Sequence, residues 1–305
     1  MNHVISAKSF AKHELLSLLQ EAKDMQDVLL AGHSRLLDGK IMAALFFEPS
    51  TRTRLSFETA MHRLGGSVIS TENAREFSSA IKGETLEDTI RVVSGYADVI
   101  VLRHYEIGAA ARAAAVSSVP VLSAGDGAGE HPTQALLDLF TIYREIGRVE
   151  DLTVALIGDL MYGRTVHSLV YVLSQFAGIR LICTAPATTP LPDDVIEYAV
   201  SRGVHIEFEQ DLHAAADKAD VLYQTRVQKE RFPSLEQYEK SRDAYIIDES
   251  ILKILGNQSI IMHPLPRLGE ITAAVDHDPR AAYFRQTHYG VPVRMALLKR
   301  AVLSE

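Results

Sequence analysis

Five consecutive polar residues, Ser50-Thr51-Arg52-Thr53-Arg54, have the types and spacing to bind an anion. They follow an apolar run typical of a buried strand and precede a stretch with a helical pattern. A helix that starts there points unpaired backbone N–H groups and the positive end of its dipole outward. Arginines are unfavourable at that end unless an external anion lies among them, so the segment predicts a phosphate site. The alternative is that Ser50 or Thr51 only caps the helix.

A loop lysine and a second strand end offer further positive charge. Ser78 and Lys82 precede a helix that Thr85 can cap, and Lys82 can reach an anion there. Arg103 follows an apolar run, and the carboxyl end of such a strand is a functional position in alternating folds. Taken alone, a loop lysine is nearly always a solvated surface residue, and Arg103 is equally typical of one.

The segment GDGAGEHPTQ at residues 125–134 predicts a glycine-rich turn that enters a helix. Its glycines permit tight turning, and Pro132 suits a first helical position. His131 and Gln134 then lie one turn apart and can meet one ligand. A structural histidine is the alternative.

The segment GDLMYGRT at residues 158–165 is close to a nucleotide-binding P-loop, which requires lysine where this chain has Arg164. Leu160 likewise stands where a dinucleotide fingerprint requires its second glycine. A strand-to-helix turn that presents an arginine is better interpreted as a clamp for a carboxylate or phosphate.

Two later segments also follow apolar runs. Arg226 and Gln228 share one face if the chain stays extended after its strand, although a solvated loop is the alternative. In the segment HPLPR at residues 263–267, two prolines stiffen a turn whose carbonyl groups can contact an ammonium group.

Strand-like and helix-like segments alternate along the chain and must position these motifs. We expect an α/β protein with two doubly wound parallel-sheet domains joined by interdomain helices, and ligands at the carboxyl ends of the strands. The first domain would comprise residues 1–132 with 287–305, and the second residues 133–286. Strands are expected at 41–47, 67–70, 99–102, 119–122, 153–157, 179–183, 205–208, 221–223, 244–247 and 260–262, with helices including 86–96, 107–116, 131–146 and 292–303.

Composition limits the classes of protein. With 305 residues, 47% of them hydrophobic, the chain can form about two domains with sizeable cores. Its formal net charge of -8 argues against a general nucleic-acid or membrane binder, so any basic site is local. Its one cysteine, Cys183, excludes an internal disulfide and a cysteine metal cluster. The chain shows neither a secretory signal nor a membrane span, so we expect a cytoplasmic protein.

The motifs taken together resemble those of the aspartate/ornithine carbamoyltransferase family over nearly the whole chain. HPLP favours the aspartate members, because ornithine enzymes typically carry HCLP and a Ser-Met-Gly signature that this chain lacks. The matching segments are FFEPSTRTR at 46–54, KGET at 82–85, HPTQ at 131–134, GDLMYGRTVHS at 158–168, TRVQKER at 225–231 and HPLPR at 263–267.

The resemblance implies roles for these residues and leaves Arg54 structural. Ser78 and Lys82 would enter from a neighbouring subunit, and Leu265, next to Pro264, would offer its backbone carbonyl to the aspartate amine. Arg164, Arg226 and Gln228 would hold the aspartate carboxylates. The phosphate of carbamoyl phosphate would be bound by Ser50, Thr51, Arg52 and Thr53, its carbamoyl end by Arg103, His131 and Gln134, and catalysis would depend on Arg52, Thr53, Lys82, Arg103 and His131.

The implied activity is carbamoyl transfer from carbamoyl phosphate to the α-amine of L-aspartate, giving N-carbamoyl-L-aspartate and phosphate in de novo pyrimidine biosynthesis. The first domain would bind carbamoyl phosphate and the second aspartate. The resemblance implies a homotrimer with shared active sites, which zinc-binding regulatory chains sometimes join into a dodecamer. We expect no cofactor, no metal in this chain, and no nucleic-acid or membrane partner. The rival hypotheses are a different acceptor amine, a nucleotide-binding module at residues 158–165, and anion binding without catalysis.

Overall fold

The structure, a computed structural model, describes residues 3–32, 34–72, 83–226, 236 and 245–303. It divides into two compact units, Met1–Phe140 with His288–Glu305, and Thr141–Thr287. The division between Phe140 and Thr141 falls inside a helix, so Gln134 belongs to the same unit as Ser50 and Arg103. In the part of the chain that the structure describes, no helix is both long and apolar enough to cross a bilayer.

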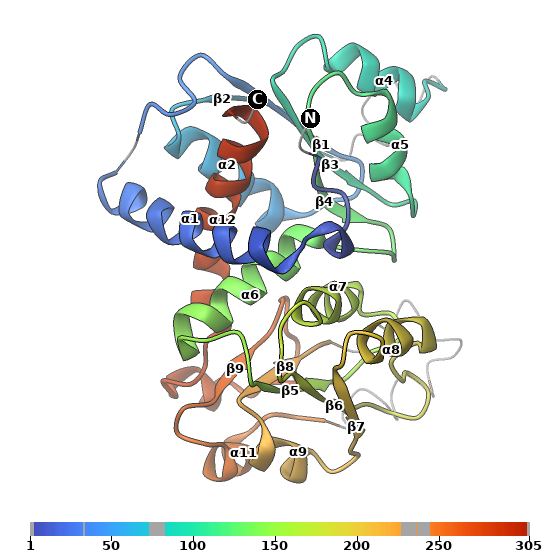
Figure 1. The fold of residues 1–305 in the computed structure, drawn as a ribbon, viewed down its shortest axis with the longest axis vertical. Coiled ribbons are helices and arrows are strands. Elements are labelled where there is room, and N and C mark those ends of the chain that lie inside the picture. Colours follow the sequence, from blue (N-terminus) through green and yellow to red (C-terminus); the bar gives the residue numbers. More distant parts are fainter. Residues whose placement is uncertain (1–2, 33, 73–82, 227–235, 237–244, 304–305) are drawn as a thin grey trace. The chain divides into compact units, whose positions relative to one another are not determined.

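Unit 1 contains a four-stranded parallel sheet in the order β2-β1-β3-β4. The first crossover connects β1 to β2 on one side of it. The next two connect β2 to β3, on the other side of β1, and β3 to β4 beyond it. Because such crossovers are right-handed, α2 lies on one face and α4 and α5 on the other (Figure 1). The elements are η1 (Ala7–Ser9), α1 (Lys12–Leu30), β1 (Ile41–Phe46), α2 (Thr51–Arg63), β2 (Ser67–Glu72), α4 (Leu86–Val93), β3 (Val99–His104), α5 (Ala109–Val116), β4 (Val121–Asp126), α6 (Pro132–Ile146) and α12 (Tyr283–Leu303), the last two continuing across a unit boundary.

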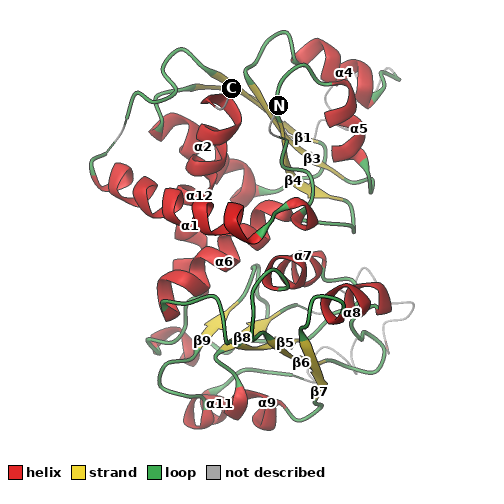
Figure 2. Cartoon of the chain, viewed as in Figure 1, coloured by secondary structure: helices red, strands yellow, loops and turns green. Residues whose placement is uncertain are grey.

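Unit 2 contains a five-stranded parallel sheet in the order β7-β6-β5-β8-β9. Helices α7 and α8 cover one face, and α9 and α11 cover the other (Figure 2). The predicted fold class, two parallel sheets flanked by helices, is confirmed. The elements are β5 (Thr153–Ile157), α7 (Arg164–Leu173), β6 (Arg180–Thr184), α8 (Asp193–Val200), β7 (His205–Phe208), α9 (Leu212–Lys218), β8 (Val221–Gln224), α11 (Glu249–Ile254), β9 (Ile260–Met262) and η4 (Ala273–His277).

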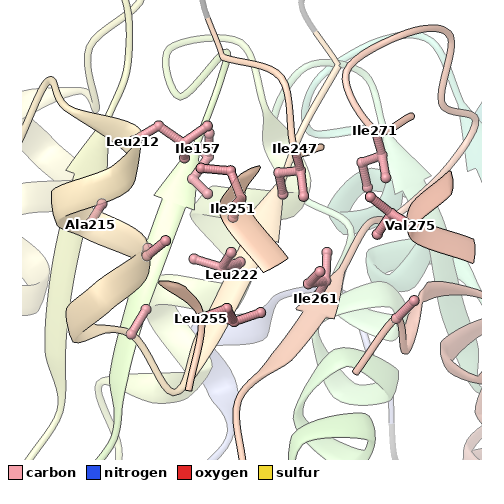
Figure 3. Packing of buried hydrophobic residues seen from close by; sticks show 14 of the residues in the cluster. Ile157, Leu212, Ala215, Leu222, Ile247, Ile251, Leu255, Ile261, Ile271 and Val275 are labelled. Carbon is pink, nitrogen blue, oxygen red and sulfur yellow. The ribbon is translucent and has the colours of Figure 1, made fainter. Parts of the chain in front are cut away.

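The central strands are buried on both faces, which is why they read as continuous apolar runs. In unit 2, Ile157, Leu222 and Ile261 from three neighbouring strands pack against Leu212 of α9 and Ile251 of α11 (Figure 3). Burying each such side chain contributes about 1.5–3 kcal/mol. This packing fixes the strand ends from which the candidate site residues leave the sheet.

The strand predicted at residues 244–247 is wrong for its described part. Tyr245 and Ile246 are outside any strand, and Ile247 forms only an isolated bridge to Ile271. Ile247 is fully buried in the cluster of Figure 3. This run is therefore apolar because it packs against the sheet, and not because it forms a strand of the sheet.

The last helix was predicted to begin at Pro292, but α12 begins at Tyr283 and contains that proline. An interior proline costs about 3 kcal/mol, which burial of Val293, Met295 and Leu298 offsets. Gly290 also lies inside α12, and a Cβ there would lie 2.3 Å from a guanidinium nitrogen of Arg294. The glycine gives the arginine room to pack inside the unit.

Candidate active site

Each sheet has one point at which the order of its strands reverses. In unit 1 this point lies between β1 and β3, and in unit 2 between β5 and β8. In doubly wound folds, ligands bind outside the carboxyl ends of the strands at such points. The candidate residues leave the sheets there, since Ser50–Thr53 and Arg103 belong to the β1 and β3 ends, and Arg164 and Arg226 follow β5 and β8.

Helix α2 begins at Thr51, directly after Ser50. The Ser50 side chain accepts no capping hydrogen bond, while its carbonyl accepts one from the Arg54 N–H at 3.0 Å. The first turn carries no acidic residue. The alternative in which Ser50 caps this helix is therefore wrong, and the first turn keeps the features expected of an anion site.

The two arginines of this turn have different surroundings. Arg54 forms ion pairs with Glu58 at 3.3 Å and Glu72 at 2.9 Å, as suits a structural residue. No carboxylate within the described ranges pairs with Arg52, and burial lowers its pKa from the usual value. An anion near Arg52 would be favoured, because it would compensate this loss of hydration. Thr53, on the same turn, is buried.

Arg103 is the penultimate residue of β3 and is only 8% exposed. Its guanidinium donates to the Ala124 carbonyl at 3.1 Å and pairs with Glu48 at 3.3 Å. The register places Arg103 beside Phe46, the last residue of β1. These contacts hold its positive charge next to the segment that leads into α2.

His131 and Gln134 lie at the start of α6, after β4. The buried His131 accepts backbone hydrogen bonds from Gln134 at 3.0 Å and Ala135 at 3.2 Å through its carbonyl. The Gln134 side-chain Nε2 donates to the buried Asp138 carboxylate at 2.9 Å. Because a carboxylate only accepts, the Gln134 amide must turn its NH₂ toward Asp138, which leaves its Oε1 as the acceptor for a ligand N–H.

The unit 2 residues come from three neighbouring strands, β5, β8 and β9. Arg164 is the first residue of α7, Arg226 lies two residues beyond β8, and Pro264 and Leu265 follow β9. Gly163, at the start of α7, supplies no side-chain cap. Two guanidinium groups and the Pro264–Leu265 turn therefore follow the carboxyl ends of neighbouring strands, which suits an amino acid with two carboxylates.

The structure thus gathers seven candidates in unit 1 and four in unit 2. Ser78, Lys82 and Gln228 lie outside the described residues. Sequence reasoning gave no role to Asp138, His263 or Glu270, because their contacts depend on the packing of side chains. Among the described residues, no three His, Cys, Asp or Glu side chains gather as a metal site would require. The unit 1 set is Ser50, Thr51, Arg52, Thr53, Arg103, His131 and Gln134, and the unit 2 set is Arg164, Arg226, Pro264 and Leu265.

The turn after β5 is closely packed against the residue after β8. Gly158 has φ +102°, and a Cβ there would lie 2.5 Å from the Thr225 carbonyl oxygen. Thr225 binds the turn in return, since its Oγ1 donates to the carbonyls of Ile157 at 2.8 Å and Asp159 at 3.3 Å. This close contact fixes the distance between the backbone segment that leads to Arg164 and the one that leads to Arg226.

We expect Gly158→Ala to lower the free energy of unfolding by about 3 kcal/mol or more, because it adds a backbone clash to an unfavourable φ. Gly203→Ala is the matched control, since Gly203 has φ +82° and nothing within 4 Å of an added Cβ. It should cost only about 1–2 kcal/mol. Thermal and denaturant unfolding measure both, and equal losses would show that close approach at Gly158 is unimportant.

Two family models cover almost all of the chain. Residues 2–144 match "Aspartate/ornithine carbamoyltransferase, carbamoyl-P binding domain", and residues 150–301 match "Aspartate/ornithine carbamoyltransferase, Asp/Orn binding domain". The chain therefore belongs to the aspartate/ornithine carbamoyltransferase family, as its motifs predicted. Residues 158–165 lie inside the second model, which argues against a nucleotide-binding P-loop there.

The similar proteins belong to the aspartate members of the family. Aspartate carbamoyltransferase 1, chloroplastic, of Pisum sativum is 54% identical over 305 residues, which cover 99% of this chain and 79% of that protein. The solved catalytic subunit of M. jannaschii aspartate transcarbamoylase has a TM-score of 0.92 and 51% identity over 99% of this chain and 98% of that one. Trypanosoma cruzi aspartate transcarbamoylase, solved with carbamoyl phosphate and aspartate, has a TM-score of 0.93 and 45% identity over 99% and 97%.

Proposed function

We propose that this protein transfers the carbamoyl group of carbamoyl phosphate to the α-amine of L-aspartate. The products are N-carbamoyl-L-aspartate and phosphate. The observation that carries this proposal is the pair of cationic clusters at the strand-order reversals of two sheets. A relative with the same fold supports it, because the Trypanosoma cruzi protein is solved both with carbamoyl phosphate and aspartate and with carbamoyl aspartate and phosphate.

The unit 1 cluster suits carbamoyl phosphate. The first turn of α2 offers backbone N–H groups, the hydroxyls of Ser50, Thr51 and Thr53, and the Arg52 guanidinium to the phosphate. At the other end of this ligand, the carbamoyl NH₂ needs an acceptor, and the Gln134 Oε1 is turned to provide one. The carbamoyl oxygen needs donors, and Arg103 and His131 are the candidates.

The unit 2 cluster suits aspartate. Arg164 and Arg226 can each bind one carboxylate through two parallel hydrogen bonds, and Gln228 would add a donor. The Leu265 carbonyl would accept a hydrogen bond from the amine and orient its lone pair. Fixing two bound reactants in this way can supply about 7–11 kcal/mol of the barrier reduction.

The reaction develops negative charge on the carbamoyl oxygen as the amine attacks the carbonyl carbon. Thr53, Arg103 and His131 would stabilise that oxyanion, and Arg52 with Lys82 would stabilise the phosphate as its bond to carbon breaks. The departing phosphate would take the proton that the amine loses. His131 thus acts as a hydrogen-bond donor and not as a general base.

Turnover with alternative acceptors tests this function. The purified chain should release phosphate from carbamoyl phosphate in the presence of L-aspartate, with formation of N-carbamoyl-L-aspartate measured by mass spectrometry. L-Ornithine should not replace aspartate, because its second ammonium group cannot pair with the arginines of unit 2. Preference for ornithine would contradict the proposed acceptor and would indicate an ornithine member of the family instead. Phosphate binding without product would favour the non-catalytic alternative.

The assembly that we propose is a homotrimer in which Ser78 and Lys82 complete a neighbouring subunit's site. We also propose that a zinc-binding regulatory chain joins such trimers, and a relative named "catalytic subunit" supports this. We propose a cytoplasmic location, although the plant relatives are named chloroplastic.

Mixing two inactive variants tests the shared site. Arg52→Ala and Lys82→Ala chains, exchanged under mild denaturation, should regain about one quarter of wild-type activity, since each required side chain is intact in half of the chains. Native mass spectrometry should give the mass of a trimer and confirm that mixed trimers form. Mixed trimers without activity would contradict the sharing of sites between subunits.

A further inference from the structure

A buried histidine and glutamate lie behind the Leu265 turn. The Nε2 of His263 is 2.8 Å from Oε1 of Glu270, and the Leu265 N–H donates to the Nδ1 of His263 at 2.7 Å. Both side chains are shielded from solvent, with 1% of His263 and 6% of Glu270 exposed. The imidazole ring therefore joins a buried carboxylate to the backbone of the turn.

The hydrogen-bond partners determine which ring nitrogen carries the proton. A backbone N–H can only donate, so the His263 Nδ1 must accept and is unprotonated. The ring proton is then on Nε2, where it is donated to Glu270. The other carboxylate oxygen, Oε2, accepts from the N–H groups of Leu268 at 3.1 Å and Gly269 at 3.0 Å. Each group in this series of hydrogen bonds can therefore act only as the donor or only as the acceptor assigned to it here.

Glu270 is charged at neutral pH. Burial alone would raise its pKa, but the hydrogen bonds from His263 and from backbone N–H groups lower the pKa to about 2. A negative charge beside Nε2 favours the proton on that nitrogen. Since both ring nitrogens are already engaged, His263 has no lone pair available to take a proton from an acceptor amine.

The turn that this pair holds has an unfavourable backbone conformation. Leu265 has φ +56°, which is uncommon for a residue with a side chain. Besides the bond from Leu265, the His263 N–H donates to Oε1 of Gln286 in α12 at 3.0 Å. Glu270 binds the following loop residues, so the turn is fixed on both sides of Leu265. Such fixation is expected where a backbone group must point in one direction.

We propose that His263 and Glu270 are positioning residues for the acceptor, holding the Leu265 backbone so that the carbonyl oxygen of this residue meets the reacting amine. This inference rests on the proposed function, in which that carbonyl orients the amine of aspartate. Neither side chain touches the substrate. Their effect should therefore concern aspartate and leave carbamoyl phosphate binding unchanged.

Two substitutions of His263 separate positioning from packing. In His263→Asn, the carboxamide oxygen reaches the position of Nδ1 and can accept the Leu265 N–H. In His263→Gln, the carboxamide reaches the position of Nε2 and can donate to Glu270, but the Leu265 N–H loses its acceptor. Both variants lose the ring and should be destabilised to similar extents. Only His263→Gln should leave the Leu265 backbone free to turn its carbonyl away from the amine.

Glu270→Gln tests the other end of the chain. Its amide group would face a donor in either orientation, because the backbone N–H groups and the Nε2–H all require acceptors. If its NH₂ turned toward the ring, the ring proton would move to Nδ1 and oppose the Leu265 N–H. Glu249→Gln is the control, since Glu249 is an exposed residue in the first turn of α11.

The measurement is steady-state kinetics with each substrate varied in turn. We expect KM for aspartate to rise about tenfold or more in His263→Gln and Glu270→Gln, and less than about threefold in His263→Asn. KM for carbamoyl phosphate should stay within about twofold in every variant. Equal aspartate KM values in His263→Asn and His263→Gln, or parallel changes for both substrates, would overturn the proposal.

The ring tautomer gives a readout that does not depend on activity. ¹⁵N-imidazole NMR of the wild-type chain, with His263→Asn to assign the signal, should show a neutral ring protonated at Nε2. Protonation at Nδ1 would overturn the proposal even if aspartate is the substrate. A wild-type chain without aspartate turnover would instead refute the proposed function, with the tautomer still deciding whether this hydrogen-bond chain exists.

Discussion

Arg52→Ala should lower kcat/KM for carbamoyl phosphate by about a hundredfold to a thousandfold, the loss typical when one donor to developing charge is removed. Arg52 is the only arginine of the first α2 turn that is not paired with a carboxylate among the described residues. Its charge would therefore be available to the phosphate both in the bound donor and as the leaving group. Steady-state kinetics and phosphate binding by calorimetry measure the two effects separately.

Arg91→Ala is the control for the loss of one positive charge from unit 1. Arg91 is 58% exposed on α4 and pairs with Asp88, which is similarly exposed. An ion pair of this kind contributes at most about 1 kcal/mol to stability and should have no effect on turnover. If Arg52→Ala and Arg91→Ala were equally active, the anion site would not lie at the start of α2.

Arg164→Ala should raise KM for aspartate by about thirtyfold or more, since truncating one partner of a buried charged pair typically costs 2 kcal/mol or more. KM for carbamoyl phosphate should change little, because that ligand is assigned to unit 1. The split between the two constants distinguishes a carboxylate clamp from a general loss of structure.

Arg180→Ala is the matched control in unit 2. Arg180 is 57% exposed and begins β6, at the opposite end of the strands from Arg164. Its loss should leave both KM values unchanged. A rise in KM for carbamoyl phosphate in Arg164→Ala, as large as that for aspartate, would contradict the assignment of Arg164 to the acceptor.

Much of the fold could be predicted because buried parallel strands have a simple signature. Strands β1, β5 and β9 are apolar runs with turn residues after them, and their burial on both faces requires that pattern. Periodicity failed where packing had the same composition, as at Ile247. It also failed where a local rule was overridden, as at Pro292, whose missing N–H is tolerated in a helix buried against the rest of its unit.

The candidate site could be predicted as a set of residues but not as a set of contacts. The types and spacing of Ser50 to Arg54 identify a helix start suited to an anion, and such reasoning needs no tertiary structure. That Arg103 pairs with Glu48, or that Asp138 turns the Gln134 amide, depends on neighbouring strands and helices. His263 and Glu270 are seven positions apart, but Pro264 and Pro266 lie between them and exclude the continuous helix in which that spacing would place two side chains on one face.

Unit 1 is built from two distant stretches of chain, and this has a consequence for how the protein is made. Helix α12 joins α1 through the ion pair of Arg300 with Glu21 at 2.9 Å, and its Arg294 lies over the Phe57 ring of α2. During synthesis, the surface of α1 and α2 that α12 covers therefore stays exposed to solvent until residues 288–303 leave the ribosome. Unit 2 is continuous and can mature first, so chains released early would expose unit 1 to chaperones and proteases.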